Sequence, residues 1–536
     1  MSDPVINAGE RPKQARNSNG EYFLNPYNFI LPPDRKKGEN DKSSGLSDGP
    51  APPRGTLAGE HLAAVIPISI TARTPILVPD QNRAIPPNPE KNRPRVLRTH
   101  CGPDDLPMIN PSSVKGMLRS AYEAITNSRY GVMSESSKTA REFRHPRGKK
   151  IPYRNSPADL AEDSGHLPAR DESELSPADR MFGWVRQGDV EDRGQTRRHE
   201  ALRGALRIDP LKLVSDPVVV RSGLAVRIPL ATLAEPKSSQ YRFYATNSEG
   251  ALLSEGAQKS REEGFNRQKQ GRLRGWKVYL PPTEVLQADH SNDAEQASSA
   301  AGYWDPESRE LGPGKQVARE YRRRIEQKVR PALDSDIEGF IPVGTRYTTT
   351  LRIQGVTVEE LSALFWLLAL PEGAVLRLGL GKPLGFGAVE VKAVWDEVRI
   401  DEVIDLQLRY RSMVPDSAIE DSDECWEASN LISHYDCLLS RCDHLKGLRD
   451  QFLDAAFGYA GAAVHYPRFD LPGEMVRPPE GKNWEPRLYE WWGANETGRK
   501  PGEGDQRDRT GQRKSLPFLG EEDAPVLPYD PTEIVQ

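Results

Sequence analysis

The sequence has little cysteine, no excess of positive charge and no long apolar run. Its 536 residues include only 4 cysteines, a density that argues against a disulfide framework. The longest apolar stretches, such as residues 361–370, are far shorter than the roughly 20 residues that span a bilayer. The N-terminal residues form no apolar signal core. We therefore expect a cytoplasmic protein with no membrane contact.

The balance of charge excludes a simple electrostatic explanation of function. With a net charge of −5, the chain as a whole does not attract nucleic acid, so any such site has to be a local basic surface. Charged residues make up 28% of the chain and hydrophobic residues 36%, as in a soluble protein of several domains. The 44 glycines and 46 prolines imply long loops, but they stay below the roughly 25–30% typical of low-complexity chains.

Hydrophobic periodicity predicts a first block of regular structure near the N-terminal third of the chain. Isoleucines alternate along a strand at 62–72. The Pro- and Arg-rich stretch 74–107 has no period, and we expect a long loop there. A helix is expected to start at Ser112, because serine is a good N-cap residue and an apolar stripe at helical spacing follows.

A second block, 341–395, carries the clearest pattern. An alternating strand is followed by a capping box, with Thr357 as cap and Glu360 three residues on, and by an apolar helix. The glycine-rich stretch 379–387 and a strand at 388–391 come next. Strand, helix, glycine loop and strand make the second half of a βαββαβ unit, and the first block fits its first half. We therefore expect an α+β fold with a ferredoxin-like (RRM-like) core and long insertions.

Two short motifs have the chemistry of an anion site. The glycine loop 379–387 lets backbone N–H groups approach a phosphate, and Lys382 adds positive charge. At 112–116, serine hydroxyls and the N–H groups of a helix start lie beside Lys115, with Arg119 one turn later. The loop is not a Walker motif, since no GK[ST] closes it. Taken alone, a plain glycine turn and an ordinary capped helix explain these residues equally well or better.

Together, in this order around a split ferredoxin-like unit, the two motifs resemble the RAMP superfamily of CRISPR effector proteins. Its members carry a serine–serine–x–lysine–glycine helix start and a C-terminal G-x-G-K/R-x-x-G-x-G loop, here 112–116 and 379–387. Residues 181–183 and 203–208 make a third RAMP-like element. The segments that look like a type III backbone-like subunit are 25–29, 236–244 and 355–370.

The resemblance implies a guide-RNA-binding subunit of a type III ribonucleoprotein complex in antiviral defence. Such a subunit would hold the guide backbone, and a thumb-like loop would separate guide from complementary target RNA into short paired stretches. Its protein partners would be other RAMP subunits and the large polymerase-like subunit. The residues that the resemblance assigns to RNA binding are Ser112, Ser113, Lys115, Gly116, Arg119, Gly379, Gly381, Lys382, Gly385 and Gly387.

The chain divides into five segments on this basis. They are a largely irregular N-terminal segment with an aromatic anchor (1–58), a first part of the RAMP core with the thumb-like loop and a basic loop (59–245), an insertion (246–340), a second part of the core with the glycine-rich loop (341–400), and a C-terminal extension with a mobile end (401–536). We expect the aromatic island at 22–31 to pack on its own domain rather than on a partner.

Cleavage of target RNA is a further implication of the resemblance. In many type III backbone subunits an aspartate in the loop between the first strand and the first helix cuts the target. Asp80, Asp104 and Asp105 lie in that loop, but the family's register falls near 96–100, which contains His100 instead. A carboxylate could bind Mg or Mn and orient the 2′-OH, and a histidine could act as general acid or base. Exposed loop aspartates are far more often merely solvated, so cleavage stays open.

Two other hypotheses stay open beside this one. The chain could process precursor guide RNA alone, as a RAMP endoribonuclease that uses His100 or another histidine without partners or metal. It could also be a non-catalytic architectural subunit of the complex. Trp276, Tyr303 and Trp304 lie beside basic stretches and could stack bases, although burial in the core is the commoner role of such aromatics.

The cysteines do not form a recognisable metal motif. Cys425, Cys437, Cys442 and His444 lack the C-x2–4-C pair of structural zinc sites, so ordinary thiols in a helical segment are the expectation.

Overall fold

The computed structural model describes most of the chain. Apart from short gaps inside them, the described ranges are 3–15, 21–35, 45–52, 61–133, 142–144, 150–152, 157–186, 200–253, 271–282, 335–407, 426–467, 488–497 and 514–531. The predictions for Tyr303, Trp304 and Cys425, and for most of the insertion, lie outside these ranges. Within them, no helix is long and apolar enough to cross a membrane.

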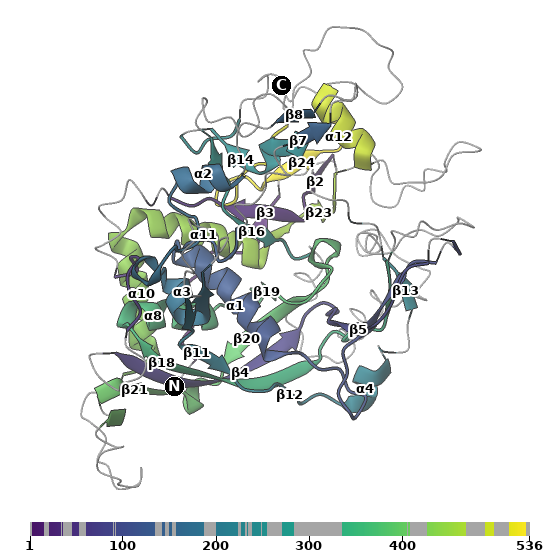
Figure 1. The fold of residues 1–536 in the computed structure, drawn as a ribbon. Helices are drawn as coiled ribbons and strands as arrows, with labels where there is room; N and C mark the ends of the chain where they lie inside the picture. The colour runs from purple at the N-terminus through teal and green to yellow at the C-terminus, as the bar shows by residue number, and fades with distance from the viewer. Residues whose placement is uncertain are drawn as a thin grey trace, which may run out of the picture.

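The centre of the fold is a seven-stranded antiparallel sheet covered on one face by helices. Its main path runs β11-β18-β4-β20-β19, with β12 pairing with β18 and β21 pairing with β4. In Figure 1 the sheet lies at the bottom and helices α1, α3 and α8 lie above it. The strands are β4 (Leu62–Ala72), β11 (Leu206–Ile208), β12 (Lys212–Leu213), β18 (Arg346–Val356), β19 (Leu376–Arg377), β20 (Ala388–Ala393) and β21 (Arg399–Glu402).

The alternation in the sequence decides which strand faces meet the helices. Ile66, Ile68 and Ile70 of β4 are at most 1% exposed, which confirms the predicted strand. Pro67 cannot donate a hydrogen bond, yet β4 is a central strand. It falls where β20, paired as far as Ile68, gives way to β21, paired from Val65. The proline therefore removes no ladder bond.

The two core helices begin as local sequence dictates, with one correction. For α8 (Val358–Leu368), the predicted capping box is confirmed, because Thr357 and Glu360 bond each other's backbone N–H groups. Helix α1 (Pro111–Ile125) starts earlier than predicted: Asn110 is its N-cap and proline takes the first position. Ser112 is thus a first-turn residue, with its hydroxyl free of a capping role.

The stretch 74–107 is not an irregular loop, contrary to the sequence prediction. It forms a hairpin of β5 (Pro79–Ile85) and β6 (Arg95–Thr99). The hairpin belongs to a four-stranded sheet of order β13-β17-β6-β5, completed by β13 (Arg227–Pro229) and β17 (Ser335–Glu338). Strand β6 pairs in parallel with a segment more than two hundred residues away, and most of its side chains are not buried. Hydrophobic periodicity within one segment cannot predict pairing with a strand so far away in the sequence.

The N-terminal aromatic island packs on the chain's own C-terminal region. Strand β2 (Tyr22–Leu24) lies between β23 (Ala463–Val464) and β24 (Val526–Pro528), and β3 (Tyr27–Ile30) pairs with β16 (Trp276–Tyr279). The expectation of packing within the chain is therefore met. Residues 514–531, which belong to the segment expected to be mobile, contribute Leu516, Leu527 and Tyr529 to one aromatic cluster with the island.

Of the other elements, α12 lies near the top of the view and α4 at the lower right, below β5 (Figure 1). The C-terminal part of the chain adds α10, packed on α8, and α11, packed on α1. The remaining bounds are β1 (Lys13–Gln14), β7 (Glu142–Arg144), β8 (Lys150–Pro152), α2 (Pro157–Asp163), α3 (Pro177–Phe182), β9 (Gly183–Val185), β10 (Ala201–Arg203), α4 (Pro217–Ser222), β14 (Ala245–Thr246), β15 (Arg272–Leu273), α10 (Ala428–Arg441), α11 (Asp443–Phe457), β22 (Tyr459–Ala460) and α12 (Leu488–Thr497).

Candidate nucleic-acid interface

The helix start and the glycine loop, more than 250 residues apart in sequence, line the same pocket of about 380 Å³. The first turns of α1 form one wall and the loop after β19 forms the other, while the β5–β6 hairpin closes a third side. The polar and glycine residues of the lining are Gln81, His100, Asn110, Ser112, Ser113, Gly116, Arg377, Gly379 and Lys382. Five of the ten residues predicted to bind RNA thus meet at one place.

The conformation of the glycine loop requires glycine at two positions. Gly379 and Gly387 have φ of +81° and +77°, and a Cβ at either position would collide with a backbone carbonyl oxygen. The other two glycines of the motif, Gly381 and Gly385, flank the 3-10 helix Lys382–Leu384. At Gly379 the loop therefore brings its backbone to the pocket, beside the side chains of Leu380 and Lys382.

Gly116 is a glycine that the protein itself does not require. It lies exposed inside α1 with no positive φ, and a Cβ built there meets no atom within 4 Å. Glycine in a helix interior costs about 1 kcal/mol relative to alanine. Since no neighbour in the described structure explains this choice, the open space fits an external ligand that approaches the helix backbone.

Arg377 is a residue of the pocket that the sequence interpretation missed. Its Nη2 donates to the carbonyl oxygens of Lys382, at 2.8 Å, and Phe386, at 2.7 Å, so the guanidinium bridges the glycine loop from inside. Burial lowers the pKa of Arg377 to about 9. Its buried Nε has no hydrogen-bond partner among the described residues. The only sequence signal was an arginine placed directly before the glycine-rich stretch.

Lys382 provides the positive charge of the loop. Burial, and secondly the nearby charge of Arg377, lower the pKa of the Lys382 ammonium below its ordinary value. Its Nζ lies 6.0 Å from the ring centre of Tyr279. An anion in the pocket would favour the charged form of the lysine, so anion binding and protonation of Lys382 support each other.

Lys115 and Arg119 do not line this pocket, although both stand in the helix-start motif. Lys115 Nζ donates to Leu206 O at 3.0 Å, which ties α1 to β11. The Arg119 guanidinium pairs with Glu123 at 2.6 Å and Asp179 at 2.8 Å. Their direct contact with RNA stays a prediction, whereas their contacts within the chain hold α1 against its neighbours.

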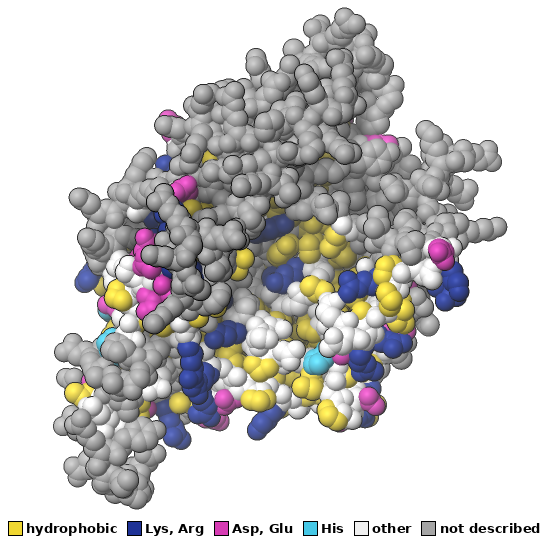
Figure 2. Space-filling view, viewed as in Figure 1, with side chains coloured by type: hydrophobic (Ala, Val, Ile, Leu, Met, Phe, Trp, Pro, Cys, Tyr) yellow, Lys and Arg dark blue, Asp and Glu magenta, His cyan; other side chains and the backbone are white. Residues whose placement is uncertain are grey.

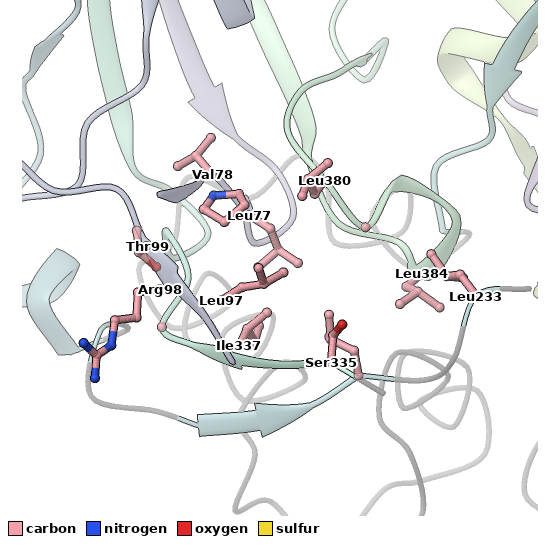
Figure 3. Close-up of a pocket in the computed structure, with 14 residues that line it drawn as sticks. Leu77, Val78, Leu97, Arg98, Thr99, Leu233, Ser335, Ile337, Leu380 and Leu384 are labelled. Atoms are coloured by element: carbon pink, nitrogen blue, oxygen red, sulfur yellow. The ribbon is translucent and has the colours of Figure 1, made fainter. Parts of the chain in front are cut away.

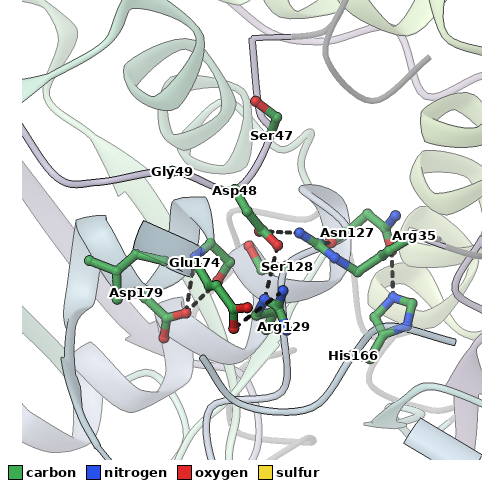
Figure 4. A network of polar contacts seen from close by, with 12 residues as sticks. Arg35, Ser47, Asp48, Gly49, Asn127, Ser128, Arg129, His166, Glu174 and Asp179 are labelled. Atoms are coloured by element: carbon green, nitrogen blue, oxygen red, sulfur yellow. Dashed lines mark hydrogen bonds and ion pairs between the residues drawn. The ribbon is translucent and has the colours of Figure 1, made fainter. Parts of the chain in front are cut away.

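The far end of α1 is anchored by a separate polar network (Figure 4). Asp48 accepts from Arg35 and, at 2.9 Å, from Arg129. His166 Nε2 lies 2.9 Å from Asn127 Oδ1, and burial is the main reason that the pKa of His166 is held well below its ordinary value. This network fixes the helix without contributing to the pocket.

One of the four candidate catalytic residues lines the pocket, and a second lies next to it without lining the pocket. His100 lines it, and its Nδ1 lies 3.7 Å from Asp80 Oδ2 on the adjacent strand. That separation is longer than a hydrogen bond. The two side chains form an ion pair only when the imidazole is protonated. Asp104 and Asp105 lie instead in an exposed turn, where Asp104 Oδ1 accepts from Leu106 N at 3.1 Å. Neither of them lines the pocket.

A second, apolar pocket of about 260 Å³ lies on the other side of the glycine loop (Figure 3). It separates Leu380 and Leu384 of the loop from Leu97 and Ile337 of the four-stranded sheet. Leu77 lies between them and also borders the first pocket. The loop is therefore supported by hydrocarbon on one face and open to polar groups on the other.

Two further predictions concern metal and base stacking. Among the described residues, no group of three or more His, Cys, Asp or Glu side chains could hold a metal ion. Cys437 and Cys442 are free thiols, and the side chains of Cys425 and His444 lie outside the described part. Trp276 is 6% exposed and packs in the core against Tyr130, so it is not a base-stacking residue.

Comparison with known proteins establishes the family. The model of the RAMP superfamily matches residues 69–390, which include both motifs, strands β11, β12, β18 and β19 of the central sheet, and parts of β4 and β20. The chain belongs to the RAMP superfamily. No curated protein matches at a significant level.

Solved structures of similar proteins were also compared. One, titled "Type IV-B CRISPR Complex", is 14% identical, with a TM-score of 0.23, and the match covers 69% of this chain and 99% of that one. Another, Csc2 of Thermofilum pendens, is 10% identical, with a TM-score of 0.25, and the match covers 78% and 95%.

Proposed function

We propose that this chain is a guide-RNA-binding subunit of a CRISPR effector complex. The observation that carries the proposal is the shared pocket, in which the first turns of α1 face the glycine loop. Serine hydroxyls and the Lys382 ammonium there would be donors for phosphate oxygens, together with those backbone N–H groups that, unlike Leu380 N, do not already donate within the chain. Such contacts bind the RNA backbone without selecting bases, as a protein that accepts any guide sequence requires.

The proposed core is ferredoxin-like. In chain order, β4, α1, β11, β18, α8 and β20 alternate as βαββαβ, and the sheet order β11-β18-β4-β20 supports this assignment. Both RNA-binding motifs then lie at one end of that unit. The β5–β6 hairpin, which projects from the sheet in Figure 1, is the proposed thumb-like element between guide and target RNA.

The type III assignment is a finer proposal and depends on sequence resemblance. It makes complementary target RNA, other RAMP subunits and a large polymerase-like subunit the partners, and the cytoplasm the place of action. The two compared structures come from a type IV-B complex and from Csc2, and their low TM-scores argue neither for nor against a type.

Copurification of guide RNA tests the binding proposal. The full-length chain is produced together with a CRISPR array, and RNA that stays bound at moderate salt is extracted and sequenced. Lys382→Glu combined with Gly116→Leu should abolish RNA loading, whereas Lys446→Glu on exposed α11 should leave it intact. Full loading of the double variant, with a melting temperature no lower than that of the wild type, would remove RNA binding from this pocket.

We propose target cleavage next to the same pocket as a second candidate function, favoured by the proximity of His100 and Asp80. Neutral His100 would accept the proton of a 2′-OH while Asp80 orients the imidazole. The described residues offer no group of three protein ligands, so Mg²⁺ or Mn²⁺ would have to use one carboxylate together with RNA phosphate and water.

Cleavage assays in the assembled complex distinguish the remaining hypotheses. His100→Ala and Asp80→Asn should each slow cutting of complementary RNA, and Asp104→Asn with Asp105→Asn serves as the matched control. Loss of cutting in EDTA would support the metal. Cleavage of repeat RNA by the isolated chain in EDTA would instead favour the processing enzyme, and no cutting by any form would favour an architectural subunit.

A further inference from the structure

A surface of alternating cations and aromatic rings adjoins the glycine loop. It is formed by β16, where Lys277 and Tyr279 lie on one face of the strand and Trp276 is buried on the other. Strand β16 pairs antiparallel with β3, which places Tyr279 opposite Tyr27. Nothing in the RNA-binding motifs predicts this surface, because β16 belongs to the insertion.

Two ammonium groups, from distant parts of the chain, lie near the ring of Tyr279. Lys277 Nζ is 5.4 Å from the centre of this ring and 3.9 Å from that of Tyr27. Lys382 Nζ, from the glycine loop, is 6.0 Å from the Tyr279 ring centre. On the face of the molecule shown in Figure 2, lysine or arginine side chains lie beside hydrophobic ones near the middle of the described surface.

Arg377 fixes β16 against the glycine loop. The same guanidinium that bridges the carbonyls of Lys382 and Phe386 also donates through Nη1 to Leu280 O, at 3.5 Å, directly after β16. The distance between Tyr279 and the pocket is therefore set by a buried side chain and not by two independent loops.

The two lysines carry charge that the described structure does not neutralise. Burial is the largest cause that lowers the pKa of both Lys277 and Lys382, and no carboxylate is among the causes for either. Partly desolvated ammonium groups without an opposite charge are unfavourable. A bound phosphate would offset that cost at Lys382, which is partly buried, more than at Lys277, which is exposed.

We propose that Lys277 and Tyr279 form a second RNA subsite, in which Tyr279 stacks on a base next to the phosphate held by the glycine loop. The alternation of ammonium, ring and ammonium matches the alternation of phosphate and base along a single strand. Lys277 would contact the next phosphate. The subsite rests on the proposed function and extends it from backbone binding to the stacking of one unpaired base.

Fluorescence anisotropy on the full-length chain tests the subsite with two labelled strands of equal length, oligouridine and an abasic ribose-phosphate strand. Tyr279→Leu should weaken oligouridine binding roughly tenfold and leave the abasic strand unaffected. Tyr279→Phe, which keeps the ring, should bind both strands like the wild type. Lys277→Gln should weaken both strands alike and reduce the salt slope by about one, while Lys446→Gln on α11 should change nothing.

The outcomes separate the subsite from the proposed function. Wild-type affinity of Tyr279→Leu for oligouridine, with Lys382→Gln still weakened, would overturn the subsite alone. Equal weakening of both strands by Tyr279→Leu would also overturn it, because a ring that stacks on a base has no effect without one. If the wild type bound neither strand but bound polyglutamate, the subsite and the RNA-binding proposal would both fall.

Discussion

Replacing Gly116 by alanine should change stability and RNA binding in opposite directions. Gly116 lies inside α1, has no positive φ, and leaves nothing within 4 Å of an added Cβ. Alanine should therefore raise the free energy of unfolding by about 1 kcal/mol. The same methyl group would stand in the space through which RNA backbone approaches the helix, so affinity should fall several-fold, and leucine should lower it more than tenfold.

Gly447 provides a matched control for this prediction. It is an exposed glycine inside α11, and an added Cβ there also meets no atom within 4 Å. Gly447→Ala should raise stability by a similar amount and leave RNA affinity unchanged. Urea denaturation and fluorescence anisotropy measure the two effects. Unaltered binding by Gly116→Leu would show that the open space is not a ligand site, and lower stability of Gly116→Ala would refute the helix argument.

Three further predictions concern charged groups in and near the pocket. Arg377→Met should lower the free energy of unfolding by about 2 kcal/mol and weaken RNA binding more than tenfold, because two carbonyls of the loop lose a charged donor. Arg377→Lys should not restore RNA affinity in binding assays, because lysine lacks the fork of N–H groups. RNA affinity should fall as pH rises through the lowered pKa of Lys382, and Lys382→Gln should remove that dependence. Burial raises the pKa of Glu123 from 4.5 to about 7, so between these pH values the folded state keeps a proton that the unfolded state has lost. The free energy of unfolding should therefore fall as the pH rises from 4.5 to about 7. Thermal unfolding of Glu123→Gln should not show that decline.

Local signals were sufficient to predict strands β4, β18 and β20 of the central sheet and helices α1 and α8. The alternation in β4, the capping box of α8 and the glycine loop each depend on residues close together in sequence, and the structure contains all three. The meeting of the two motifs at one pocket was implied by the family resemblance rather than by either motif. Their shared pocket is the geometry that this resemblance requires.

The missed features depend on contacts between distant segments. The hairpin β5–β6 is held by pairing with β17, and the segment 514–531 is ordered by its strand beside β2. Apart from its place before the glycine-rich stretch, no local signal in the sequence distinguishes Arg377 from other arginines, because its role depends on the loop carbonyls that its guanidinium contacts in the fold. For Lys115 and Arg119 the sequence suggested a contact that the structure does not contain. Positive charge at a helix start suggests an anion site, but both side chains contact other residues of the chain.

The salt dependence of RNA binding tests the central claim most directly. If the pocket between α1 and the glycine loop holds phosphate, Lys382→Gln should reduce the slope of log affinity against log salt by about one, equally for oligouridine and oligoadenine. An unchanged slope, or a reduction for one base alone, would contradict a site that binds the RNA backbone.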